Sequence, residues 1–83
     1  MKIFNGNKME TKSALMKHFA KKLSLPEYFG ANWDALEEVL NDFEELEISF
    51  KHQKRILYRE PEQLNTWNQI IESCKKNKSI IVK

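Results

Sequence analysis

The sequence contains very little cysteine, glycine or proline. The single cysteine, Cys74, cannot form an intrachain disulfide, so the fold must be stable without one. Two glycines and two prolines leave no material for a glycine-rich phosphate loop or a proline-rich linker. Because the chain has 83 residues and no composition break that resembles a linker, we expect one domain over residues 1–83.

Long apolar runs are also missing. No segment approaches the roughly 18 apolar residues of a membrane span. The opening residues, MKIFNGNKME, lack the apolar core of roughly 7–15 residues that a signal peptide needs. We therefore expect no membrane association and a location in the reducing cytoplasm.

Positive charge is absent from one continuous segment. Residues 26–47 hold eight acids and no Lys or Arg, whereas the other 61 residues hold 14 basic and four acidic side chains. The formal net charge of +2 conceals this asymmetry. A local negative field repels nucleic acid and attracts a basic partner, so the segment indicates a protein-binding function.

The spacing of apolar residues predicts short strands alternating with helices. In chain order, we expect strand 1–4, helix 11–23, helix 33–42, strand 46–50, a helix from about 61 through 74, and strand 79–82. Residues 54–59 fit a strand or a helical turn equally well. Helical crossovers between short strands predict a small parallel sheet with right-handed connections, which is an α/β fold.

The predicted second helix has an apolar side and an acidic side. Its apolar residues cluster on one face, and Asp34, Glu37 and Glu38 lie on a face rotated by roughly 100°. A helix stabilised by its own ion pairs would place Lys four residues from such acids, and here there is none. The acidic side therefore suits a function in binding better than one in helix stability.

The same carboxylates could instead be catalytic or bind a metal. A general acid–base pair needs an enclosed pocket that separates two pKa values, and an exposed helix surface offers none. The segment has no EF-hand spacing and no histidine. His18 and His52 lack ligand spacing, so we expect both at the surface, and Cys74 fits a core thiol. We expect no enzyme activity, no metal and no cofactor.

Basic residues elsewhere in the chain suggest RNA binding as an alternative. The residues concerned are Lys51, Lys54, Arg55, Arg59, Lys75, Lys76 and Lys78, with Tyr58 and Trp67 as stacking groups. Trp67, however, falls on the apolar side of the third helix, and the strands show no interleaved aromatic residues. We therefore do not favour direct nucleic-acid binding.

Residues 23–42, LSLPEYFGANWDALEEVLND, resemble the barstar family, whose members carry an LPEYYGxNLDAL-type loop and second helix. IFNG at 3–6 resembles the family's first strand and turn, and SIIVK at 79–83 resembles its last strand. The resemblance implies a three-stranded parallel sheet packed by three to four helices. It also implies an intracellular inhibitor, monomeric before binding, that occludes the cationic active site of a guanyl-preferring microbial ribonuclease.

Carried over by position, the family's partner contacts fall in the loop and the second helix, at Tyr28, Gly30, Asn32, Trp33, Asp34, Glu37 and Glu38. To these the predicted site adds Phe29, Phe43, Glu45 and Glu72. The family's dominant acid aligns with Glu38, and Glu37 replaces an aromatic residue. A gap leaves open whether the contact on the third helix is Glu72 or Ser73. A barstar-like domain whose partner is another basic protein or toxin is the alternative.

Overall fold

The structure is a computed structural model, and it describes residues 1–25 and 32–83. The elements in these residues are β1 (Lys2–Asn5), η1 (Gly6–Lys8), α1 (Lys12–Lys22), α2 (Trp33–Asn41), β2 (Leu46–Lys51), η2 (Gln53–Arg55), η3 (Pro61–Gln63), α3 (Leu64–Lys76) and β3 (Ile80–Val82). The η segments are short 3₁₀ turns. The predicted α/β fold with a small parallel sheet is confirmed.

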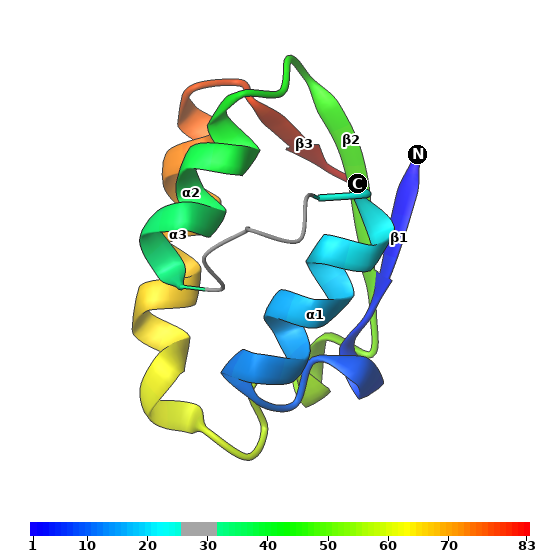
Figure 1. The fold of residues 1–83 in the computed structure, drawn as a ribbon, viewed down its shortest axis with the longest axis vertical. Helices are drawn as coiled ribbons and strands as arrows, with labels where there is room; N and C mark the ends of the chain where they lie inside the picture. The colour runs from blue at the N-terminus through cyan, green and yellow to red at the C-terminus, as the bar shows by residue number, and fades with distance from the viewer. Residues whose placement is uncertain (26–31) are drawn as a thin grey trace.

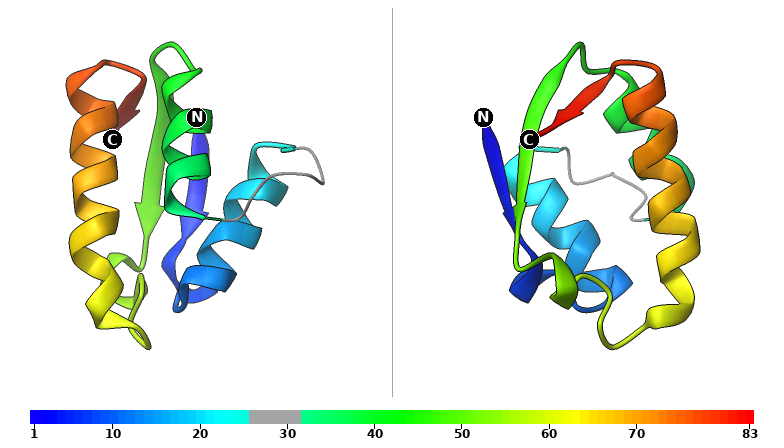
Figure 2. Two further views of the ribbon diagram at one scale, coloured as in Figure 1. Left: turned by 60° about the vertical axis from the view of Figure 1, so that its left-hand side comes forward. Right: turned by 180° about the vertical axis from the view of Figure 1, so that it is seen from behind.

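The three strands form one parallel sheet in the order β1-β2-β3. Phe4 of β1 is opposite Phe50 of β2, and Leu46 of β2 is opposite Ile80 of β3. Both crossovers step to the neighbouring strand in the same direction, so right-handed connections place all the helices on one face. Figures 1 and 2 show α1, α2 and α3 on that face, with the other face of the sheet left open.

The core fills the space between the sheet and the helices. Phe4 stacks on Phe19 at 4.2 Å between ring centroids, and the Trp67 ring packs against the rings of Phe19 and Phe50. Trp67 is only 5% exposed, as its place on the apolar stripe predicts. Cys74 is fully buried, which confirms the core thiol. Burial raises the pKa of this thiol, and the Glu37 carboxylate adds to the rise.

Helix α1 lies within the range 11–23 that the apolar spacing predicts. The Thr11 hydroxyl accepts a hydrogen bond from the Ala14 amide at 3.1 Å, so Thr11 is the N-cap. The helix ends at Lys22, and the Leu23 amide donates to the Phe19 carbonyl at 2.9 Å. None of the helices in the described residues is long and apolar enough to cross a membrane.

Residues 54–59 resolve as 3₁₀ and turn structure, so the strand alternative is wrong. Leu57 is fully buried with a φ of 56°, and its amide donates to the Met9 carbonyl at 2.7 Å. Such a left-handed residue interrupts the extended backbone that a strand requires. The helix predicted from about residue 61 also begins later: Pro61 opens η3, and α3 starts at Leu64.

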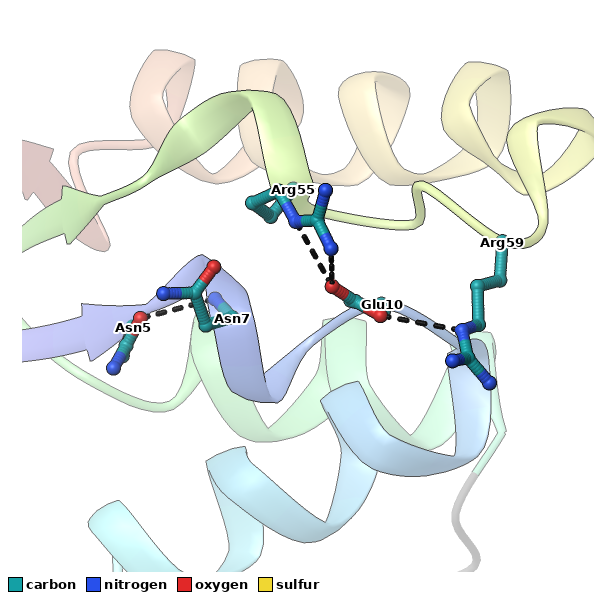
Figure 3. Close-up of polar contacts among 5 residues, drawn as sticks. All are labelled: Asn5, Asn7, Glu10, Arg55 and Arg59. Carbon is teal, nitrogen blue, oxygen red and sulfur yellow. Dashed lines mark hydrogen bonds and ion pairs between the residues drawn. The ribbon is translucent and has the colours of Figure 1, made fainter.

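The Glu10 carboxylate links residues 54–59 to the segment just before α1 (Figure 3). Glu10 accepts a hydrogen bond from Arg55 Nε at 2.9 Å, and its other oxygen lies 3.3 Å from Arg59 Nε. In the same view the Asn5 side chain accepts a bond from the Asn7 amide at 3.0 Å, which caps η1. The contacts of Glu10 with Arg55 and Arg59 thus hold residues 54–59, which contain little regular structure, against the start of α1.

His18 is not at the surface, which corrects the prediction. His18 is only 8% exposed. Its ring lies edge-on to the ring of Phe4, with 5.6 Å between the ring centroids. Its Nε2 accepts a hydrogen bond from the Asn5 amide at 3.1 Å. Burial lowers the pKa of His18, and the nearby lysines Lys22, Lys8 and Lys21 lower it further. The neutral imidazole serves as a backbone acceptor beside the end of β1.

Candidate functional site

Helix α2 carries the predicted binding residues, and its first turn is well capped. The Asn32 side chain accepts a hydrogen bond from the Ala35 amide at 2.8 Å, and its carbonyl accepts from the Leu36 amide at 3.0 Å. Asp34 lies in the first turn, where a carboxylate interacts favourably with the helix dipole. Local sequence therefore specifies where α2 begins.

The apolar side of α2 holds the helix against the core. Leu36 and Leu40 are fully buried, and Trp33 is half-buried with its ring centroid 6.3 Å from that of Trp67. The Trp33 indole N–H donates to Oε1 of Gln63 at 2.8 Å, and the Lys12 ammonium lies 5.8 Å from the Trp33 ring centroid. Trp33 thus anchors α2 and leaves only part of its ring at the surface.

The last residue of α2 is anchored in the same way. Asn41 Oδ1 accepts hydrogen bonds from the Ser79 hydroxyl at 3.1 Å and from Asn77 Nδ2 at 3.4 Å. Both donors lie in the turn between α3 and β3. Because α2 also packs along α3, the helix is held at each end and along one side. Its outward side chains start from a rigid backbone.

The acidic ridge, defined as Asp34, Glu37 and Glu38, lies along the outward side of α2. Asp34 and Glu38 are exposed and Glu37 is half-buried. Among the residues that the structure describes, none of the three forms an ion pair with Lys or Arg. The carboxylates are therefore gathered on one helix, and no described lysine or arginine is paired with them.

Glu37 differs from the other two acids of the ridge. Its negative charge contributes to the raised pKa of the buried Cys74 thiol of α3. Glu37 is half-buried, while Asp34 and Glu38 are exposed.

The other predicted residues lie around this ridge at greater separation. Phe43 is half-buried just after α2. Glu45 is exposed at a φ of 53°, beyond the opposite end of the helix from Asp34, and its amide donates to the Lys78 carbonyl at 3.0 Å. Glu72 is exposed on α3 and lies 3.4 Å from Lys75, whereas Ser73 is half-buried. Tyr28, Phe29 and Gly30 lie outside the described residues.

The residues that position α2 were not predicted from sequence. Gln63, Asn77 and Ser79 are 30 to 38 residues away from the side chains they bond. Nothing in the local pattern of a polar residue indicates such a partner. In the described part of the chain, no three His, Cys, Asp or Glu side chains are grouped in a way that could hold a metal ion.

Comparison with known proteins adds one finding. No curated protein is similar enough in sequence to count as a match. The family model described as Barstar (barnase inhibitor) matches residues 1–80, which is nearly the whole chain. This match agrees with the three-stranded parallel sheet and its helices. The chain belongs to the Barstar (barnase inhibitor) family.

Proposed function

We propose that this protein inhibits a microbial, guanyl-preferring ribonuclease by covering the enzyme's cationic active site with the loop before α2 and with α2 itself. The predicted contacts in the described residues are Asn32, Trp33, the acidic ridge, Phe43, Glu45 and Glu72. We further propose that the free protein is a monomer and that it acts in the cytoplasm without a cofactor.

One observation carries this proposal: the three carboxylates of the acidic ridge have no cationic partner among the described residues. Like charges at i and i+4, such as Asp34 and Glu38, repel each other and weaken an isolated helix. A basic partner would relieve that repulsion. Membership of a family of barnase inhibitors supports a nuclease as that partner.

The chemistry of occlusion follows from charge and geometry. A ribonuclease binds the phosphodiester backbone with basic side chains, so carboxylates on a rigid helix can occupy the phosphate positions without offering a bond to cleave. Because α2 is already held at Trp33 and Asn41, little conformational freedom remains to be lost on binding. The negative field should also accelerate the encounter with a cationic enzyme.

Inhibition of a guanyl-preferring ribonuclease by the purified protein tests the proposal. We expect stoichiometric inhibition, and we expect the isosteric variants Asp34→Asn and Glu38→Gln to weaken it. Truncating one member of a desolvated charge pair costs about 2–5 kcal/mol, a range that inhibitors of this family helped to define. The matched control is Glu62→Gln. Glu62 is an exposed acid of η3, so this substitution removes one negative charge outside α2.

Each outcome of this titration has a clear meaning. Loss of inhibition in the two α2 variants but not in Glu62→Gln supports the acidic ridge as the contact. Absence of inhibition toward any guanyl-preferring ribonuclease, with tight binding to a basic non-nuclease toxin, would favour the alternative partner. Inhibition that all three variants retain in full would contradict the proposed contact surface.

A further inference from the structure

A second charged region lies away from the acidic ridge, where α1 meets η1 and the end of β1. A cavity of about 550 Å³ is lined there by Lys8, Ala14, Lys17, His18, Lys21 and Lys22. An adjoining cavity of about 320 Å³ shares Lys8, His18 and Lys22 and adds Lys51. We call these two cavities and their five lysines the lysine pocket. Its larger cavity is within the usual range of small-molecule sites, roughly 300–1,000 Å³.

Among the described residues, no acid forms an ion pair with the lysines of this pocket. In residues 1–25 and 32–83, ion pairs join acids to Arg55, Arg59, Lys75 and Lys83, and none involves a lysine of the pocket. Four of the lysines line the larger cavity and three line the smaller one, with Lys8 and Lys22 common to both. Like charges gathered in this way repel each other. Their convergence on a concave surface suits a bound anion.

His18 supplies a fixed hydrogen-bond donor to the same hollow. Because Nε2 accepts the Asn5 amide hydrogen, the proton of the neutral ring lies on Nδ1. Nδ1 has no hydrogen-bond partner among the described residues, and no described side-chain nitrogen or oxygen is both fully buried and unsatisfied. The Nδ1–H group is therefore open to solvent at a ring that lines both cavities. Phe4 and the Asn5 amide hold this ring in place.

The field of the lysines reaches the imidazole. After burial, the positive charges of Lys22, Lys8 and Lys21 are the causes that lower the pKa of His18. Lys8 and Lys22 line both cavities with His18, and Lys21 lines the larger one. An anion placed among them would interact with the ammonium groups and with the Nδ1–H donor together.

We propose that the lysine pocket binds a small anion through two or more linked phosphate groups. Lysine ammonium groups bind phosphate oxygens as mobile point charges, and the imidazole N–H adds one oriented donor. The cavities are large enough for more than a single phosphate. The phosphate chain itself is the recognised group, whether it is free or belongs to a nucleotide.

The surroundings of the pocket favour phosphate recognition over a nucleic-acid strand. Strand binding uses exposed aromatic rings on which bases stack. Among the described residues, the large exposed hydrophobic side chains are Met1, Ile3 and Tyr58, and the Arg55 guanidinium lies 4.5 Å from the Tyr58 ring centroid. Apart from the buried His18 ring, the described residues that line the lysine pocket carry no aromatic side chain.

Titration with inorganic pyrophosphate at low salt, followed by NMR, tests this proposal. We expect saturable, one-to-one shifts of the His18 ring protons and the Asn5 amide. The double variant Lys8→Gln/Lys22→Gln should bind at least about tenfold more weakly, because each ammonium near a phosphate contributes a few-fold in affinity. The matched control is Lys54→Gln/Lys76→Gln, which removes the same charge from exposed positions outside the pocket.

The outcomes distinguish a specific anion-binding site from non-specific electrostatic attraction of anions. Equal weakening in both double variants, shifts that never saturate, or an unmoved His18 would overturn the proposal. A nucleoside triphosphate and inorganic triphosphate that bind equally would support recognition of the phosphate chain alone. A short single-stranded RNA that binds more tightly than pyrophosphate, and is not displaced by it, would overturn it. Circular dichroism of each variant checks that the fold is retained.

Discussion

The indole N–H of Trp33 donates to the side-chain oxygen of Gln63 at 2.8 Å, and this bond joins the first residue of α2 to the residue that precedes α3. Both side chains are half-buried. No local sequence pattern indicates this bond. It nevertheless fixes the N-terminal end of the acidic ridge relative to α3.

Gln63→Ala should lower the free energy of unfolding by about 1 kcal/mol, because it leaves a half-buried indole donor without its partner. Urea denaturation measures the change. Gln69→Ala is the matched control, since Gln69 is an exposed glutamine of α3, and its effect should stay within about 0.5 kcal/mol. Equal effects of the two substitutions would show that the indole bond contributes nothing.

If the proposed inhibition is correct, association with the ribonuclease should slow as salt is raised, while dissociation changes less. Mobile ions screen the long-range attraction that steers the encounter, with a Debye length near 10 Å at about 0.1 M salt. Stopped-flow measurement gives both rates. Asp34→Asn should show a shallower salt dependence than Glu62→Gln. An association rate that salt leaves unchanged would argue against steering by the acidic ridge.

Gly6→Ala should destabilise the protein by roughly 1–3 kcal/mol, as overpacking does elsewhere. An added Cβ at Gly6 would lie 2.0 Å from the carbonyl oxygen of His52 and 3.0 Å from that of Lys51, and both are backbone atoms that cannot rotate away. Thermal or chemical denaturation measures the loss. Asn7→Ala, at the exposed neighbouring position in η1, should be nearly neutral. A Gly6→Ala protein as stable as the wild type would contradict the close approach.

Stability should fall as the pH drops below the ordinary pKa of histidine, 6.5. His18 has a lowered pKa in the folded state, so the unfolded chain binds the proton more readily in this range. Protonation also removes the lone pair that accepts the Asn5 amide hydrogen. Denaturation at about pH 7.5 and about pH 5.5 measures the change. His18→Gln, which keeps an acceptor but does not titrate there, should show a smaller loss, and an equal loss would contradict this account.

Much of the fold is predictable because its signals are local. The Thr11 cap, the apolar spacing of Leu15 and Phe19, and the alternation through Ile48 each lie within a few residues of the element they specify. The two-sided character of α2 is equally local, so the buried pair Leu36 and Leu40 and the outward carboxylates could be assigned from helical periodicity.

The remaining features depend on contacts between distant segments. His18 is buried because Phe4 and Asn5 of β1 lie against it, whereas the lysines at 17, 21 and 22 on the same helix are typical of a surface. Lys17 and Lys21 are four residues apart, a spacing visible in the sequence. That Lys8 lines the same cavity, and that Lys51 lines the adjoining one, follows only from the packing of β1, β2 and α1.

The order of the sheet leaves two outer strands, β1 and β3, and neither is long. They span four and three residues, respectively. Lys2 lies within β1, and Lys83 directly follows β3. Unpaired strand edges can template stacking into aggregates, and short edges that carry lysine resist it. The same small sheet that supports α2 should therefore keep the molecules dispersed at high concentration.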